Sequence, residues 1–281
     1  MILITIVLYK TDISNSLSYK TLIENIKKLE KYSPSILIYN NSPELEVSHS
    51  SEYIVRNAEE NEMLAGAYNY AYKMAKSDGY KWLLLLDQDT ELTSQYFDEL
   101  NIFLDKIDGE EYNVVVPILS YKNHHLSPLV CKKDIGPFSK LKEIKNNNDL
   151  LSVGENEFIV AYNSVSLISV EALNKIGGFG NQYKLDMLDY YYYYKLSEIK
   201  SKVYILPVSL NQNLSLLEDN SFMSIGRYRD YLYYRFKFAR LLGFKSVFFY
   251  KLNLLKELLF HLRKCHSFKY IQLLIKYFFK W

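Results

Sequence analysis

Residues 82–92 read WLLLLDQDTEL, an apolar run that changes abruptly into acids and a hydroxyl. Such a run is typical of a strand buried on both faces of a parallel sheet. Side chains two apart in an extended chain point the same way, so Asp87 and Asp89 should converge where the strand ends. Convergent carboxylates repel unless a cation lies between them, and their oxygens suit Mg²⁺ or Mn²⁺ completed by phosphate and water. The alternative is a pair of acids that caps the next helix.

Strand-like and helix-like segments alternate on both sides of this motif. Apolar runs predict further strands at 2–9, 36–39, 53–55, 114–119 and 203–208, with an extended stretch at 158–169. Apolar residues at helical spacing predict helices at 17–32, 61–76, 93–106, 170–176, 185–199, 227–242 and 245–278. This order predicts an α/β fold with a mostly parallel, doubly wound sheet, which binds ligands beyond the carboxyl ends of its strands. The segments expected on that rim are Tyr9–Asp12, Asn40–Ser42, Asn57 and Asp87–Thr90.

The bulk properties indicate a globular chain with an uneven charge. Hydrophobic residues make up 49% of the 281 residues, which is ordinary for a globular protein. The two cysteines, Cys131 and Cys265, have neither disulfide nor zinc spacing and suit a reducing cytosol, and we expect no leader peptide and no membrane span. Residues 226–281 hold 13 Lys and Arg against two acids, +11, which leaves −9 for residues 1–225 of a chain at +2.

Several stretches together resemble family 2 glycosyltransferases, in particular the bacterial rhamnosyltransferase-like branch that builds cell-surface polysaccharides. They are LITIVLYK at 3–10, ILIYNNS at 36–42, NEMLAGAYNYAYKMA at 61–75, WLLLLDQDTEL at 82–92 and YNSVSLISVEALNKIGGFGNQYKLDMLDYYYYYKL at 162–196. The resemblance implies a GT-A-type, Rossmann-like domain over residues 1–225. Its nucleotide-sugar half would be 1–120 and its acceptor half 121–225, followed by a basic amphipathic helical extension over 226–281.

The resemblance also implies roles for individual residues. Asp87 and Asp89 would hold the divalent metal, Mg²⁺ or Mn²⁺, with Gln212 as a weaker oxygen ligand. Asp189 would be the general base, with Asp186 beside it in the family's Asp-x-x-Asp pattern. If that stretch is helical, the two acids share one face. The donor-binding residues would be Tyr9, Asn40, Ser42, Asn61, Asn69, Asp87 and Arg227. The acceptor side would be lined by Asn163 and Ser164.

Four positions depart from the family pattern. Asn40 replaces the usual Asp of the second strand, Met63 stands where Gly is expected, and Gln212 replaces a His near the metal. Tyr190–Tyr194 occupies the place where Glu or His often follows the second Asp. These replacements put full activity and strong metal binding in question.

The function that we expect is inverting transfer of a sugar from a nucleotide-diphosphate donor to a polysaccharide or lipid-linked acceptor. The branch suggests rhamnose as the sugar. One alternative is a non-catalytic partner subunit that binds a nucleotide sugar without turnover. A phosphohydrolase of the haloacid dehalogenase type also carries Asp-x-Asp-x-Thr, but on its first strand and with a later Gly-Asp pair that this chain lacks.

The last helices predict a peripheral protein at the cytoplasmic face of the cell membrane. Their basic residues punctuate apolar residues at helical spacing, a pattern typical of helices that lie in a lipid interface. The recurring apolar residues are Phe244, Val247, Phe248, Leu252, Leu255, Leu259 and Leu262. The same face would serve equally for packing on the sheet domain or for a homodimer seam. Nucleic-acid binding is not expected, because the basic residues form no polar stripe.

Overall fold

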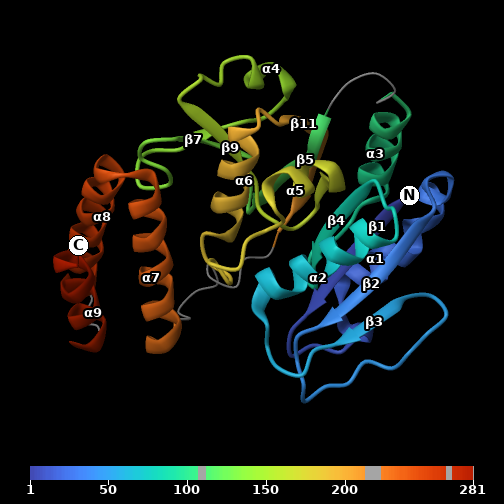
Figure 1. Ribbon diagram of the computed structural model, residues 1–281, viewed down its shortest axis with the longest axis horizontal. Coiled ribbons are helices and arrows are strands. Elements are labelled where there is room, and N and C mark those ends of the chain that lie inside the picture. Colours follow the sequence, from blue (N-terminus) through green and yellow to red (C-terminus); the bar gives the residue numbers. More distant parts are fainter. Residues whose placement is uncertain (107–111, 213–222, 264–267, 281) are drawn as a thin grey trace. The chain divides into compact units, whose positions relative to one another are not determined.

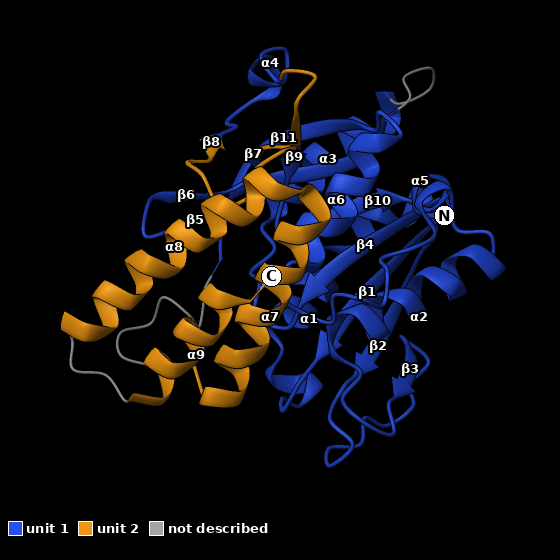
Figure 2. Cartoon of the chain, turned by 60° about the vertical axis from the view of Figure 1, so that its left-hand side comes forward, with its two compact units in different colours: residues 1–129, 143–153, 159–213 blue, residues 130–142, 154–158, 214–281 orange. Residues whose placement is uncertain are grey.

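The computed structural model divides the chain into two compact units, which Figure 2 shows in different colours. It describes residues 1–106, 112–212, 223–263 and 268–280. Unit 1 consists of residues 1–129, 143–153 and 159–213, and unit 2 of residues 130–142, 154–158 and 214–281. The predicted boundary at 225 thus differs from the compact units, which group two earlier segments with the last helices. The functional division into donor and acceptor halves stays a prediction.

A mixed sheet forms the centre of unit 1, and its eight strands within the described residues are drawn in Figure 1. Seven follow each other in the spatial order β11 (Lys202–Asn211), β5 (Tyr112–Tyr121), β10 (Ser166–Ser169), β4 (Trp82–Asp87), β1 (Ile2–Leu8), β2 (Pro34–Asn40) and β3 (Ile54–Asn57), and β6 (His124–Ser127) pairs with β5. Neighbours among β1 to β4 are parallel, as are β5 and β11. β10 is antiparallel to both β4 and β5. The predicted α/β fold with a mostly parallel sheet is confirmed.

Helices cover both faces of this sheet, as the two-faced apolar character of its strands requires. The helical elements of unit 1 are η1 (Ile13–Asn15), α1 (Leu17–Asn25), η2 (Ile26–Tyr32), α2 (Met63–Ser77), α3 (Ser94–Lys106), α4 (Asn147–Leu150), α5 (Val170–Ile176) and α6 (Leu188–Glu198). Ile4 and Ile6 of β1 share a core with α1, η2 and α3. α2 packs on β1 and β4 through small residues such as Ala67 and Ala71. The predicted helix 17–32 is α-helical only to Asn25 and ends in 3₁₀ turns.

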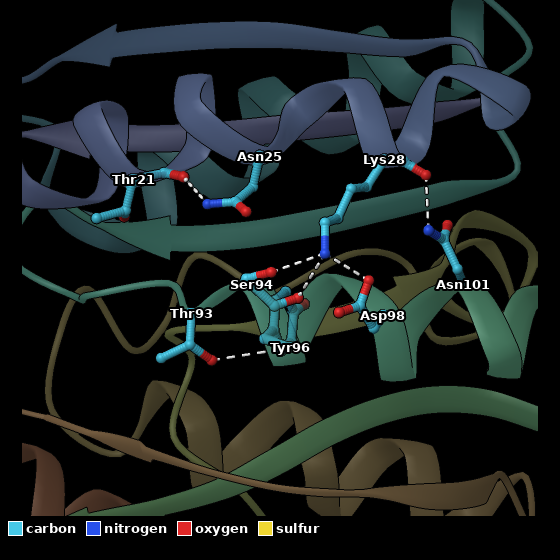
Figure 3. A network of polar contacts seen from close by, with 8 residues as sticks. All are labelled: Thr21, Asn25, Lys28, Thr93, Ser94, Tyr96, Asp98 and Asn101. Carbon is cyan, nitrogen blue, oxygen red and sulfur yellow. Dashed lines mark hydrogen bonds and ion pairs between the residues drawn. The ribbon is translucent and has the colours of Figure 1, made fainter.

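A polar network, drawn in Figure 3, joins η2 to α3. The ammonium of Lys28 donates to the hydroxyl of Ser94 at 2.7 Å and pairs with Asp98 at 2.5 Å. The amide of Asn101 donates to the carbonyl of Lys28 at 2.6 Å. Phe97 and Leu100 on the same helix are fully buried, and burial of each such side chain stabilises by about 1.5–3 kcal/mol. The apolar face therefore supplies most of the stability of this layer, and the network fixes its register.

Residues 121–156, for which the sequence predicted no structure, contribute short strands and one helical turn. β7 (Leu129–Lys132) lies between β8 (Lys142–Glu143) and β9 (Glu157–Val160) in a second, three-stranded sheet.

Unit 2 ends in α7 (Ile225–Leu242), α8 (Phe244–Arg263) and α9 (Phe268–Phe279). The single helix predicted over 245–278 is therefore wrong, because two helices lie there and pack on each other. The rings of His261 and Tyr270 stack at 5.4 Å, and Lys251 lies over the ring of Phe278 at 5.9 Å, so α9 runs back along α8. Across the described ranges, no helix combines the length and the apolar character that crossing a bilayer demands.

Candidate active site

The predicted rim lies at the carboxyl ends of the parallel strands of unit 1. β1 is followed in sequence by β2 on one side and has β4 on its other side, so the strand order reverses between β1 and β4. Ligands of open α/β sheets bind at such a reversal. Asp87 is in register with Val7 at the end of β1. Asn40 at the end of β2 is in register with Leu8 at the end of β1, and Asn57 at the end of β3 is in register with Asn40. The ends of these strands therefore lie along one edge of the sheet, as predicted.

The loop after β4 is held by the backbone and hydroxyl groups around it. The hydroxyl of Ser18 accepts from the amide of Thr90 at 2.9 Å and lies within hydrogen-bond distance of the carbonyl oxygens of Asp87 and Thr90. The side chain of Gln88 accepts from the amide of Tyr9 at 2.8 Å. These bonds fix the loop that carries the acids, in which Asp89 is exposed at the surface but partly desolvated by the groups around it.

Asp87 is a half-buried carboxylate with one donor. The hydroxyl of Tyr68, which is fully buried on α2, donates to Asp87 Oδ1 at 3.3 Å. The pKa of Asp87 is raised to about 7, because burial and the neighbouring charge of Asp89 raise it more than the Tyr68 hydrogen bond lowers it. Burial also raises the pKa of Asp89. Two acids that are hard to ionise together create the demand for a cation that the sequence predicted.

Asp189 lies in the electrostatic field of the same site. Its pKa is raised to about 7: burial is the largest cause, the hydrogen bond from the amide of Tyr190 lowers the pKa, and the charges of Asp186 and Asp87 raise it. Asp186 is not on the helix, because α6 begins at Leu188 after Met187, whose φ of 62° is left-handed. The conditional expectation of two acids on one helical face is therefore wrong. Asp186 lies in the loop before the helix and Asp189 in its first turn.

Gln212 and the predicted acceptor residues meet at Thr90. The hydroxyl of Thr90 donates to Gln212 Oε1 at 3.0 Å and lies 2.6 Å from the hydroxyl of Ser164. Ser164 Oγ also accepts from the amide of Asp87 at 3.3 Å. The neighbouring Asn163 has a buried side-chain oxygen without a hydrogen-bond partner. Hydrogen bonds thus link Asp87, Ser164, Thr90 and Gln212, whereas the roles of Gln212 at a metal and of Asn163 and Ser164 on the acceptor side stay predictions.

Asn40 uses its amide inside the loop that follows β2. Its nitrogen donates to the carbonyl of Ser42 at 3.2 Å and to Asn57 Oδ1 at 2.9 Å, and its oxygen accepts from the amide of Ser42 at 3.0 Å. The nitrogen also donates to the carbonyl of Leu45. An Asp at this position would turn these donors into repelling oxygens. The replacement therefore stabilises the loop, and the donor-binding role of Asn40 and Ser42 stays a prediction.

The start of α2 explains why glycine is expected at position 63. Met63 has a φ of 59°, in the left-handed region that favours glycine. Its amide donates to Asn61 Oδ1 at 2.9 Å, and its carbonyl accepts from Asn41 at 3.0 Å. Met63 thus keeps the turn at the cost of backbone strain.

Asn69 holds the turn at residues 179–181, which precedes the loop of Asp186. Its oxygen accepts from the amide of Phe179 at 3.0 Å, and its nitrogen donates to Asn181 Oδ1 at 3.0 Å. Gly178 leaves room for this contact, since a β-carbon there would lie 2.8 Å from Asn69 Oδ1. These bonds belong to the chain itself, and a contact of Asn69 with the donor stays a prediction.

Arg227 lies in unit 2, in the first turn of α7, where its amide donates to Ser224 Oγ at 3.3 Å. Its predicted contact with the donor stays a prediction. The sequence did not indicate two residues that shape the site, Ser18 and Tyr68. No local motif distinguishes Ser18, whose partners lie about 70 residues away. Tyr68 precedes Asn69 on the helix already singled out, which was the available signal.

The residues at this rim fit a divalent cation whose remaining ligands come from a bound donor. The described ranges contain no group of three or more His, Cys, Asp or Glu side chains arranged to hold a metal. Mg²⁺ and Mn²⁺ sites often use one or two carboxylates completed by substrate phosphates. Asp87 and Asp89 supply two carboxylates, and Gln212 Oε1 has a second lone pair beyond its bond with Thr90.

Known proteins of the same architecture are glycosyltransferases. The structure of GalNAc-T7 with UDP, GalNAc and Mn²⁺ has a TM-score of 0.52 and 13% identity, covering 82% of this chain and 46% of that one. TarS residues 1–349 from S. aureus have a TM-score of 0.48 and 10% identity, covering 98% of this chain and 90% of that one. This chain therefore spans less than half of GalNAc-T7. A comparison with curated protein sequences gave no significant match.

The mixed sheet, the acids at its strand reversal and the similarity to the GalNAc-T7 structure define a GT-A-like fold. Residues 21–177 match the family described as glycosyl transferase family 2, which is more than half of the chain. The chain belongs to that family. The rhamnosyltransferase-like branch is a finer assignment that this match does not test.

Proposed function

We propose that this chain is a metal-dependent, inverting glycosyltransferase that uses a nucleotide-diphosphate sugar. The observation that carries the proposal is the place of Asp87 at the strand reversal, where its charge interacts with that of Asp89 and with that of Asp189. Asp87, Asp89 and Gln212 would hold the cation. When bound, a divalent cation offsets the negative charge that develops on the leaving diphosphate.

Asp189 is suited to receive the proton of the acceptor hydroxyl. In the transfer, the acceptor oxygen forms a bond to the anomeric carbon while the bond from that carbon to the diphosphate oxygen breaks. The hydroxyl proton passes to the Asp189 carboxylate. Because the acceptor oxygen attacks the anomeric carbon directly, the configuration is inverted in one displacement and no covalent enzyme intermediate is needed. A base with a pKa of about 7 combines ionisation near neutral pH with appreciable basicity.

The class of donor is supported by the site itself, whereas the sugar and the acceptor are supported only by the sequence motifs. A nucleoside diphosphate is favoured by the two metal-binding acids, and the Mn²⁺ and UDP of the GalNAc-T7 structure are consistent with it. Rhamnose as the sugar and a polysaccharide or lipid-linked acceptor rest on the resemblance of the motifs alone.

Two variants and one control test the proposal. Thermal unfolding of the chain with a panel of nucleotide sugars, with and without Mn²⁺, identifies the donor, because a ligand well above its Kd stabilises by several kcal/mol. With that donor, Asp89→Ala should abolish metal-dependent stabilisation and transfer. Asp189→Asn should keep donor binding and lose about 10²–10⁴ in transfer rate.

Asp98→Ala is the matched control, because it removes an exposed carboxylate that pairs with Lys28. It should leave transfer unchanged. Transfer that survives Asp89→Ala, or that EDTA does not reduce, contradicts the metal-dependent mechanism. Binding of a donor without turnover by the purified parent chain would favour a partner subunit instead.

A further inference from the structure

An exposed apolar stripe runs the length of α8. At 100° per residue, its members fall within an arc of about 80° over a length of about 27 Å. Each member is 38–76% exposed. We call these residues the outer stripe: Phe244, Phe248, Leu252, Leu255, Leu259 and Leu262.

The core of unit 2 uses a different face of the same helix. Val247, Tyr250, Leu254 and His261 of α8 are buried. Their mean direction lies about 130° around the helix axis from the outer stripe. The hydroxyl of Tyr250 donates to the carbonyl of Leu232 at 3.1 Å, which anchors this inner face to α7. α8 therefore has two apolar faces, one of which packs inside its unit.

Basic residues line both edges of the outer stripe. Lys245, Lys256 and Arg263 lie along one edge, about 20–40° beyond it, and Lys251 lies along the other. Lys245 forms an ion pair with Asp134 at 2.6 Å, so Lys256 and Arg263 carry most of the charge of the first edge. The single acid of α8, Glu257, accepts from the guanidinium of Arg235 at 2.5 Å.

α9 repeats the pattern on a smaller scale. Phe268, Ile275 and Phe279 are 43–71% exposed and fall within about 40° of each other, with Lys269 and Lys276 along one side. α9 has no acidic residue.

The charges decide between the two surfaces that fit such a stripe. The alternating spacing of four and three residues from Phe248 to Leu262 also suits a helix–helix seam with a second copy. A second copy packed along this stripe would bring Lys256 and Arg263 of both copies together, and neither α8 nor α9 offers an acid opposite them, which is unfavourable. An anionic lipid surface instead places phosphates opposite the basic edges and accepts the apolar side chains below them.

We propose that the outer stripe of α8, with the exposed apolar residues of α9, binds the surface of an anionic lipid bilayer. α8 lies in the plane of the interface, with the stripe toward the acyl chains and its basic edges among the headgroups. The proposal does not depend on the proposed glycosyl transfer.

Co-sedimentation of the full chain with vesicles tests it. Vesicles of phosphatidylcholine mixed with phosphatidylglycerol should bind the chain, and added salt should weaken the binding. The double variant Leu255→Ser/Leu259→Ser should lower the partition coefficient roughly tenfold or more. Lys256→Gln/Arg263→Gln should lower it roughly 30-fold on anionic vesicles, from about a kcal/mol for each charge, and leave binding to phosphatidylcholine alone unchanged.

Leu151→Ser is the matched control, because Leu151 is 88% exposed and lies in unit 1. It should bind like the parent. The four residues that these double variants replace are all exposed, so each variant should unfold at the temperature of the parent. The Lys256→Gln/Arg263→Gln variant tests the same surface without removing a leucine. Equal binding by the parent and both double variants, or no binding by the parent, overturns the proposal. A lipid-free dimer in sedimentation velocity that Leu255→Ser/Leu259→Ser dissociates also overturns it, in favour of a second copy.

Discussion

Replacing Met63 by glycine and by alanine tests the left-handed turn at the start of α2. Both variants lose the same thioether side chain, which is 37% exposed, so the packing loss cancels in the comparison. They differ in the β-carbon, which costs roughly 1–2 kcal/mol at a φ of 59°. The additional unfolded-state entropy of glycine opposes this by about 0.5–1 kcal/mol. Met63→Gly should therefore be more stable than Met63→Ala by up to about 1.5 kcal/mol.

The same pair of substitutions at Lys73 supplies the control. Lys73 is exposed in the interior of α2, where alanine should exceed glycine by about 1 kcal/mol. Urea unfolding of the four variants measures both differences, provided that the m-value is constant. The reasoning requires the order of alanine and glycine to reverse between positions 63 and 73. If alanine is the more stable at both, the turn does not hold Met63 in a left-handed conformation.

Three further predictions address the site. The pKa of Asp189 is raised when folded, so the metal-free chain binds more protons than its unfolded form between about pH 4 and 7 and loses stability as pH rises through that window. Asp189→Asn should remove part of this loss of stability. In thermal unfolding, the variant should therefore have a higher Tm than the parent at pH 8 and the same Tm as the parent at pH 5. Gly178→Ala should destabilise by about 2–3 kcal/mol, because it combines a φ of 82° with the clash against Asn69. Gly177→Ala, at a similar φ with open space around it, should cost about 1–2 kcal/mol in the same urea experiment, and equal costs would remove the clash from the account. Tyr68→Phe should keep the fold and weaken Mn²⁺ binding about three- to tenfold in a titration, because the carboxylate loses its donor; unchanged affinity would mean that this bond does not assist the metal site.

The regular part of the fold could be predicted because its signal is local. Apolar runs and helical periodicity predicted α5 to the residue, Val170–Ile176, and β4 within one residue. The helix expected over 245–278 failed because apolar spacing continues through both α8 and α9 and does not reveal where the chain turns back. Residues 121–156 gave no prediction, since the short strands there pair with partners that no local pattern identifies.

The site divides in the same way. The acids at the end of β4 and Asp189 follow from the strand pattern and the motif order. The hydroxyl of Ser18 could not be predicted, because its role depends on where α1 lies against the loop at Thr90. The conformation of Met187 also has no sequence signal, and it removes Asp186 from the helix that carries Asp189.

The antiparallel strand β10 links the two parts of the chain that were predicted as the donor and acceptor halves. β10 pairs with β4 on one side and β5 on the other, with Ser166 opposite Leu85. β4, which leads to the predicted metal-binding acids, is thus paired on one side with residues more than 70 positions later in the chain. These residues come just after the predicted acceptor residues. A fragment that ends at residue 120 would leave β4 and β5 without the strand between them. During synthesis, β4 and β5 can be joined only after residue 169 has emerged, so this part of the sheet depends on slow, long-range pairing.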